Sequence, residues 1–242
     1  MKNKAWLLLL ATLFSLFVCP TCQDRLFDNP FDPQATEVVF EVVNTILTPA
    51  FYPQGLAWDG NTLWNVDIYS NTLYSLNRLN GAQVYSLSSP LPVTTGVAYD
   101  GENLWVCSES YVDVYKINVI NGDILKRLNL QRGSFTAITY GLEGLWLADT
   151  QTNSIIRVDP ITAEVTGSFS NPGTFVSGLA FDGESLWIAD STTFSIYQLN
   201  PDGQLLRTFL PPGPSPQGIT HDGTFLWNVD ANQKIYQLRM IE

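Results

Sequence analysis

Five tryptophans recur along the chain at an almost constant interval, and this interval limits the folds that the chain can adopt. Successive members of the series are 41, 41, 41 and 40 positions apart. A fixed period of about 40 residues is typical of architectures that repeat one small unit around a ring or along an array. The series consists of Trp64, Trp105, Trp146, Trp187 and Trp227.

The first four repeats contain the same four short runs, and the fifth contains the first three of them. The first run carries small and apolar residues and, in four of the five repeats, ends at Asp-Gly, a two-residue turn signal, as in Gln54–Gly60. The second carries a Leu-Trp pair, the third resembles Leu73–Leu76, and the fourth resembles Gln83–Leu87. Four short strands per repeat of roughly 40 residues predict the blade of a β-propeller, an all-β fold.

The two ends of the chain indicate how the ring closes. The last repeat stops at Glu242 after its third run, and a strand-like run, Thr36–Val43, precedes the first repeat without a blade of its own. We therefore expect a five-bladed propeller over residues 36–242, in which the N-terminal run supplies the missing outer strand of the last blade. Such closure removes open sheet edges. The tryptophans are expected to pack between adjacent blades, where each ring buries a large apolar area.

Composition narrows the classes of partner. Of the 242 residues, 45% are hydrophobic and 14% are charged, which suits one compact domain with a core. The net charge of −11 argues against a nucleic-acid partner, because phosphate contacts need clustered Lys and Arg. An acidic balance fits cations or basic partners, and it also simply favours solubility.

The N-terminal segment has the pattern of a targeting signal. Lys2 and Lys4 precede the apolar run Ala5–Val18, which has the length of a signal peptide and is short for a membrane span. Cys19 and Cys22 follow directly. This arrangement resembles a bacterial lipoprotein signal, in which a cysteine becomes the lipidated first residue. A cleaved secretory signal is the alternative.

The lipoprotein interpretation divides the chain into three parts. Residues 1–21 form the signal peptide, residues 22–35 a polar tether, and residues 36–242 the propeller. A lipid on Cys19 or Cys22 anchors a protein to a membrane without spanning it. The expected location is the bacterial cell envelope, on the periplasmic or surface side.

Few residues offer catalytic or zinc chemistry. The chain has one histidine, His221, which occupies a slot held by Trp, Tyr or Phe in the other repeats and is expected in the core. Cys107 occupies a slot of Ala or Val and is also expected in the core. A zinc site and nucleophile–histidine catalysis therefore have little support, and we predict no metal site of these ligand types.

A carboxylate recurs where the second run ends. Four of the five repeats have an aspartate at this position, and the second repeat has Ser108 there, followed by Glu109. Two interpretations stay open. An Asp at a strand end caps the next turn by accepting backbone N–H bonds. A ring of hard oxygen ligands alternatively holds calcium, which is the one cofactor that the sequence leaves open. The recurring residues are Asp67, Asp149, Asp190 and Asp230.

A polar residue begins each first run, and blade geometry places it on the same face as the acidic ring, nearest the axis. We expect these residues to hydrogen-bond a ligand at the mouth of a central channel: Gln54, Thr95, Thr136, Ser177 and Gln217. Aromatic residues near the same rim either stack on sugars or peptide side chains or shield the blade edges. They are Phe51, Tyr52, Tyr69, Tyr111, Phe135, Phe175 and Phe194.

The repeat pattern is similar to two groups of known propellers. Gly-x-Ala-aromatic-Asp-Gly-x-x-Leu-Trp-x-x-Asp over residues 53–242 resembles bacterial NHL and streptogramin-lyase-like propellers. The opening Gln54–Leu56 and the blade count resemble plant-type glutamine cyclotransferases, which close the ring of an N-terminal glutamine in peptides. That resemblance implies a carboxylate acid/base, for which Asp67 or Glu109 is the candidate.

These features predict a binding or scaffold module without catalysis, whose upper face takes a protein, peptide or glycan. A cyclotransferase-like enzyme and a calcium-stabilised structural module are the alternatives.

Overall fold

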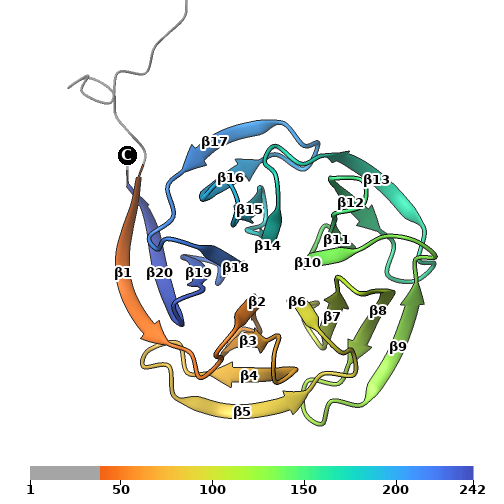
Figure 1. Cartoon of the computed structure of the whole chain (residues 1–242), viewed down its shortest axis with the longest axis horizontal. Helices are drawn as coiled ribbons and strands as arrows, with labels where there is room; N and C mark the ends of the chain where they lie inside the picture. The colour runs from red at the N-terminus through yellow and green to blue at the C-terminus, as the bar shows by residue number, and fades with distance from the viewer. Residues whose placement is uncertain (1–38, 242) are drawn as a thin grey trace, which may run out of the picture. The chain divides into compact units, whose positions relative to one another are not determined.

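A computed structural model describes residues 39–241, which form five four-stranded antiparallel sheets around one axis (Figure 1). Blades 1 to 4 comprise β2–β5, β6–β9, β10–β13 and β14–β17, and blade 5 comprises β18, β19, β20 and β1. The predicted five-bladed β-propeller is confirmed. The expectations for residues 1–38 lie outside the described part of the chain.

The strands take four positions from the axis outwards. The innermost strands are β2 (Pro53–Trp58), β6 (Thr94–Tyr99), β10 (Phe135–Gly141), β14 (Val176–Phe181) and β18 (Pro216–His221). The second are β3 (Leu63–Asp67), β7 (Leu104–Ser108), β11 (Gly144–Asp149), β15 (Leu186–Asp190) and β19 (Leu226–Asp230). The third are β4 (Thr72–Leu76), β8 (Tyr111–Ile117), β12 (Ser154–Val158), β16 (Ser195–Leu199) and β20 (Lys234–Ile241). The outermost are β5 (Gln83–Ser88), β9 (Ile124–Asn129), β13 (Val165–Ser170), β17 (Leu205–Phe209) and β1 (Val39–Leu47).

The ring closes as predicted, through β1. This strand pairs antiparallel with β20, from Val39 opposite Ile241 to Leu47 opposite Lys234. It extends further towards the C-terminus than the predicted run did, because Ile46 is buried in the cluster between blades 5 and 1. In Figure 1 the two strands lie side by side at the perimeter of the ring.

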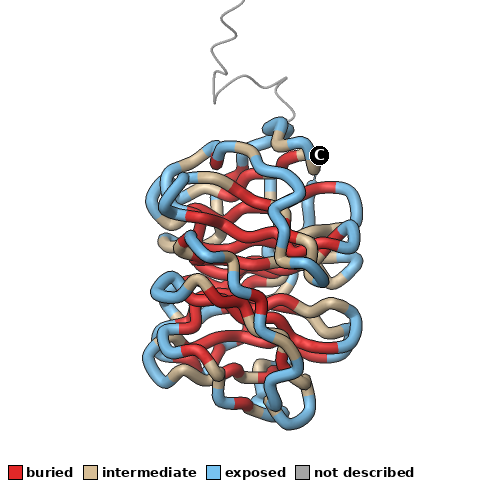
Figure 2. The backbone as a smooth tube through the Cα atoms, turned by 90° about the vertical axis from the view of Figure 1, so that its right-hand side faces the viewer, coloured by how far each residue is buried: buried red, intermediate tan, exposed pale blue. Residues whose placement is uncertain are grey.

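Burial follows the layers of the ring. The second strands are buried along their whole length, whereas the outermost strands are largely exposed. Seen edge-on, buried backbone fills the middle of the propeller and exposed loops lie along its two faces (Figure 2). Within residues 39–241 there is no helix of the length and apolarity that crossing a bilayer requires.

All five tryptophans lie at the junction between their own blade and the next, as predicted. Each is at most 3% exposed. Trp64 belongs to one cluster with Val97 and Leu104 of blade 2. Trp227 belongs to another with Leu56 and Leu63 of blade 1, so the series of junctions closes on itself.

In four blades, the aspartate that directly follows the inner strand accepts a hydrogen bond from the tryptophan of the same blade. In blade 4, Asp182 Oδ1 accepts hydrogen bonds from the backbone N–H groups of Glu184 and Ser185, at 2.8 and 2.6 Å. Its Oδ2 accepts one from Trp187 Nε1 at 2.7 Å. The same carboxylate therefore fixes the loop and orients the ring. Blades 1, 2 and 5 repeat the arrangement at Asp59, Asp100 and Asp222.

The expectation of a two-residue turn at Asp-Gly is wrong. Phe181 pairs with Leu186, so four residues form the loop, and the carboxylate binds the N–H groups of the last two. Blade 3 has Gly141 in place of the aspartate. Its carbonyl oxygen accepts from Trp146 Nε1 at 3.1 Å, and here the loop shortens to two residues, both with positive φ.

The aspartate–tryptophan bond gives a prediction for stability. Asp182→Asn replaces one of the two acceptor oxygens with an NH₂ group. This group faces either Trp187 Nε1 or the loop N–H groups, so one donor loses its acceptor in either orientation. We expect the free energy of unfolding in urea to fall by about 1–3 kcal/mol. Glu184→Gln, an exposed change in the same loop, is the control and should stay within about 0.5 kcal/mol of the parent chain. Equal stability of the two variants would contradict the structural role of the bond.

Candidate functional site

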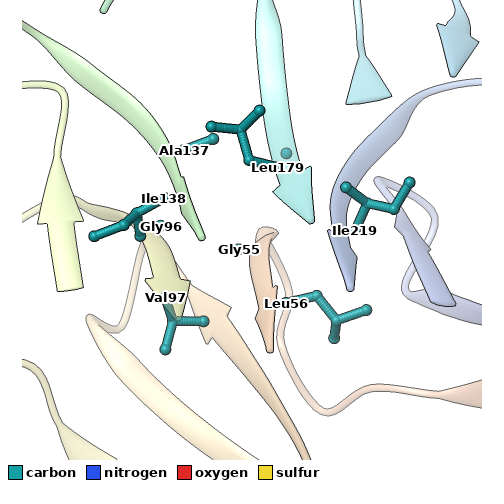
Figure 3. Close-up of a pocket in the computed structure, with 9 residues that line it drawn as sticks. Gly55, Leu56, Gly96, Val97, Ala137, Ile138, Leu179 and Ile219 are labelled. Carbon is teal, nitrogen blue, oxygen red and sulfur yellow. The ribbon is translucent and has the colours of Figure 1, made fainter. Parts of the chain in front are cut away.

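The axis of the propeller is closed by aliphatic side chains. The inner strands of all five blades contribute one each, as Figure 3 shows: Leu56, Val97, Ile138, Leu179 and Ile219. The empty space between them is about 150 Å³, and none of it admits a water-sized sphere. The centre of the ring is therefore a packed apolar plug without a passage for a ligand.

Glycine next to these aliphatic residues lets the inner strands approach one another. A Cβ on Gly55 would lie 2.8 Å from Val97 N of blade 2, and one on Gly178 would lie 2.8 Å from Ile219 N of blade 5. Real Cβ atoms do not approach backbone so closely, so these positions require glycine.

The predicted polar ring lies between the blades. Three members are at most 3% exposed, and each hydroxyl donates to a backbone carbonyl of the following blade. Thr95 Oγ1 donates to Phe135 O at 2.9 Å, and Thr136 Oγ1 to Val176 O at 2.6 Å. Ser177 Oγ donates to Pro216 at 2.8 Å. These hydroxyls thus join neighbouring inner strands.

A register irregularity produces this orientation. In every blade the pairing between the first and second strands shifts at the polar residue, for example between Phe135 and Ala137 around Thr136. The extra residue turns towards the neighbouring blade. Gln217 is buried and donates to Ser215 Oγ at 3.1 Å, whereas Gln54 is only partly buried.

The predicted acidic ring is buried, and its oxygens point to loop backbone. Asp190 accepts four N–H bonds: Oδ2 from Thr174 and Phe175 at 2.6 and 2.9 Å, and Oδ1 from Thr192 and Thr193 at 2.9 and 2.8 Å. One carboxylate therefore ties together two loops of the upper rim. The other three carboxylates make bonds of the same kind: Asp67, Asp149 and Asp230.

Blade 2 has Ser108 at this position, and its hydroxyl accepts a backbone bond from Ser110 N at 3.2 Å and also bonds to carbonyl oxygens. It donates towards Pro92 O and Val93 O, at 3.0 and 2.8 Å. Its neighbour Glu109 is exposed. Among residues 39–241 no three His, Cys, Asp or Glu side chains are grouped closely enough to hold a metal ion.

Cys107 lies in the core as expected, whereas the expectation that His221 lies in the core is wrong. Cys107 is fully buried, and burial raises the pKa of its thiol to about 12, so it is protonated and unreactive at neutral pH. His221 is half-buried, and its Nδ1 accepts from Gly223 N at 3.2 Å. Burial lowers the pKa of His221. The negative charges of Asp182 and Asp222 raise it by less, so the neutral ring is favoured.

The loops of the upper rim carry almost no charge, although four buried capping aspartates lie at the strand ends next to them. Here the second strand leads to the third, and one blade connects to the next. The loops of this rim contain two charged residues, Glu109 and Arg132. The loops of the lower rim contain one basic residue, Arg78, and eleven acidic ones: Asp59, Asp100, Glu102, Asp123, Glu143, Asp159, Glu164, Asp182, Glu184, Asp202 and Asp222. The two faces of the ring therefore differ sharply in electrostatic character.

Aromatic side chains are exposed on the upper rim. At blade 1, Phe51, Tyr52 and Tyr69 are 72%, 60% and 83% exposed, and the two tyrosine rings lie 5.6 Å apart, centroid to centroid. Further exposed rings on this rim are Tyr111, Phe175 and Phe194. Phe135 differs from these residues because it is fully buried, so a role in stacking on a ligand is ruled out for it. Its ring packs back against Gly133 into the cluster between blades 2 and 3.

A groove at the upper side of blade 3 was not expected from the sequence. Its volume is about 370 Å³, and it runs from Leu130 and Arg132 to Val165 on the outer strand. Ile156 lies in its wall. The other four repeats have tyrosine at this position, so one departure from the pattern is the signal that could have found the groove.

The carboxylate geometry gives a prediction that separates a turn cap from a calcium site. Asp190→Asn removes the charge and one acceptor, so we expect about 1–3 kcal/mol of destabilisation in urea. We expect no change in melting temperature on adding calcium or chelator, in either protein. Glu109→Gln, which alters an exposed carboxylate of the same rim, is the matched control. A calcium-dependent rise in melting temperature that disappears in Asp190→Asn would contradict the cap.

Solved structures resemble the propeller, although the sequence matches no protein-family model and no curated protein. Glutaminyl cyclase from Myxococcus xanthus superposes with a TM-score of 0.73 at 13% identity, covering 85% of this chain and 98% of the cyclase. Virginiamycin B lyase from Staphylococcus aureus, in complex with quinupristin, gives 0.52 at 20% identity, covering 80% and 68%. The β-propeller domain of Cps50 (Swd1) from Myceliophteria thermophila gives 0.54 at 11%, covering 82% and 99%. At these identities the likeness shows the fold alone, that of a β-propeller.

Proposed function

We propose that the chain is a binding module of the cell envelope, a rigid five-bladed ring whose upper rim takes a protein, peptide or glycan and performs no catalysis. The contrast between the two rims carries the proposal. The upper loops contain one Glu and one Arg, whereas the lower loops carry a large acidic excess. Depletion of charge together with exposed aromatic rings is the composition of interface centres.

Blade 1 supplies the strongest part of this surface. Asp67 Oδ2 accepts from Phe51 N at 3.0 Å, and its Oδ1 accepts from Tyr69 N at 2.9 Å. One buried carboxylate thus fixes both loops that present the aromatic rings. A preorganised surface loses less conformational entropy on binding. Tyrosine offers an apolar face and a polar tip, which suits a sugar ring or an apolar peptide side chain.

The predicted polar ring contributes to this surface only at its edge. The hydroxyl groups of Thr95, Thr136 and Ser177 donate hydrogen bonds to backbone carbonyls of neighbouring blades. Gln54 is partly buried and follows Tyr52 by two residues. The proposed contacts therefore lie on the loops above the closed axis.

The aromatic pair can be tested on glycan and peptide arrays. We expect the double variant Tyr52→Ala/Tyr69→Ala to lose at least about tenfold in affinity for the ligands that the parent chain selects, because aromatic anchors dominate such interfaces. Tyr85→Ala removes an exposed tyrosine ring from the outermost strand β5 and is the control. Unchanged binding by the double variant would refute this part of the proposal.

A glutaminyl-peptide cyclotransferase is the second candidate, supported by the likeness to a glutaminyl cyclase at a TM-score of 0.73. Its acid/base would be Asp67 or Glu109. Asp67 already accepts several loop N–H bonds, so its oxygens hold the loops in place, and Glu109 lies open to solvent.

The enzyme candidate has a direct test. Incubating the chain at high concentration with a glutaminyl dipeptide should release no ammonia above the uncatalysed rate if binding is the function. Ammonia release that Glu109→Gln or Asp67→Asn abolishes would establish the enzyme instead.

The envelope location rests on residues 1–35, where Cys19 or Cys22 is the proposed lipid anchor. A diacylglyceryl adduct on an N-terminal cysteine, measured by intact mass in the membrane fraction, tests it.

A further inference from the structure

The five blades differ at one position that faces the neighbouring blade. The third strand of four blades carries a tyrosine there: Tyr74, Tyr115, Tyr197 and Tyr236. Blade 3 carries Ile156, which pairs with Leu147 on one side and Ser168 on the other, in the register that Tyr197 has in blade 4. Blade 3 therefore keeps the position and lacks the ring.

The other blades show what the position accepts. In blade 4, the hydroxyl of Tyr197 donates to Thr193 Oγ1 at 2.9 Å, and the ring lies against Gly173 in the upper connection. In blade 5, burial and then the charge of Asp230 raise the pKa of Tyr236, so this phenol lies near the capping carboxylate. In blade 4 the slot thus holds a phenol whose hydroxyl binds a threonine, and in blade 5 the phenol lies near the capping aspartate.

Blade 3 retains the threonine and the capping aspartate. Asp149 and Thr152 correspond to Asp190 and Thr193, and Thr152 Oγ1 bonds Asp149 Oδ2 at 2.8 Å. Both line the groove of about 370 Å³, together with the hydroxyl of Ser154 and the apolar side chains of Leu130 and Ile156. This volume lies in the range of small-molecule sites, and apolar walls with a few directed polar groups are their usual lining.

Blade 3 also adds a cation at the rim of the slot. Arg132 occupies the position over blade 3 that Gly173 occupies over blade 4. Each lies two residues after a residue, Leu130 or Asn171, whose backbone N–H makes the corresponding bond to the preceding blade. The side chain of Arg132 is exposed and lines the groove. No ion pair within residues 39–241 involves it. Its guanidinium is therefore available to a carboxylate.

We propose that this groove between blades 2 and 3 binds a phenol ring carried by a ligand with an anionic group beside it. The ring occupies the space that tyrosine fills in the other blades. Its hydroxyl meets Thr152 and Asp149, and the anion meets Arg132. The ligand is either a tyrosine side chain in an acidic segment of a partner chain or a free hydroxyphenyl carboxylic acid.

The groove does not involve the aromatic pair of blade 1. Amide shifts in blade 3 report binding at this groove alone, so this inference and the proposed function can fail independently of each other.

A single substitution in blade 3 can fill the groove with a tyrosine side chain of the protein itself. Ile156→Tyr restores the residue that four blades already hold, so we expect the variant to fold and to melt no lower than the parent chain. Binding is followed by amide chemical shifts of the full ¹⁵N-labelled chain. The probes are N-acetyl-tyrosine, N-acetyl-tyrosinamide, N-acetyl-leucine and an acidic peptide with an internal tyrosine.

We expect the tyrosine carboxylate to shift amides of blade 3, the neutral amide to bind about fivefold more weakly, and the leucine probe to give no shift at the same concentration. Ile156→Tyr should abolish the shifts, and Arg132→Gln should remove the preference for the carboxylate. Binding of the peptide alone would assign the ligand to a partner chain, whereas binding of both would admit the free acid. Affinity unchanged in Ile156→Tyr, or no shift with any tyrosine probe, would overturn the proposal.

Discussion

The inner strands of the five blades meet backbone against backbone, and the rest of the structure depends on this close approach. Gly55 and Gly178 leave no room for a Cβ beside the next strand. The approach brings threonine and serine hydroxyls within reach of carbonyl groups in the following blade. It also leaves an axial space that five aliphatic side chains fill. A tight ring and an open channel are therefore incompatible in this chain.

The sequence predicted the architecture because the features that define it are periodic. The tryptophan interval, the Asp-Gly loops and the unpaired N-terminal run are visible without coordinates, and each has a direct structural counterpart. The polar ring was placed on the right strand and face, but its side-chain direction depends on an irregularity of register. Alternation along a strand cannot reveal such an irregularity. The burial of Phe135 similarly depends on Gly133, which belongs to a loop.

Positions that break the repeat were harder to interpret than positions that keep it. Gly141 replaces an aspartate, and the chain compensates locally, with a carbonyl acceptor and a shorter turn. Ile156 replaces a tyrosine, and nothing else in blade 3 fills the space, so a groove remains. The same kind of departure is thus repaired in one place and left open in another. Only the open one offers a surface to a ligand.

Closure through β1 makes the order of synthesis matter. Blade 5 combines the first described strand with the last three, so β1 has no partner until β20, near the end of the chain, is available. Four blades can assemble from neighbouring segments, whereas the fifth joins β1 to β20 across all the other blades, a contact of high sequence separation that slows folding. A nascent chain of this protein therefore carries an unfinished ring, with two exposed edges, until β20 has been synthesised.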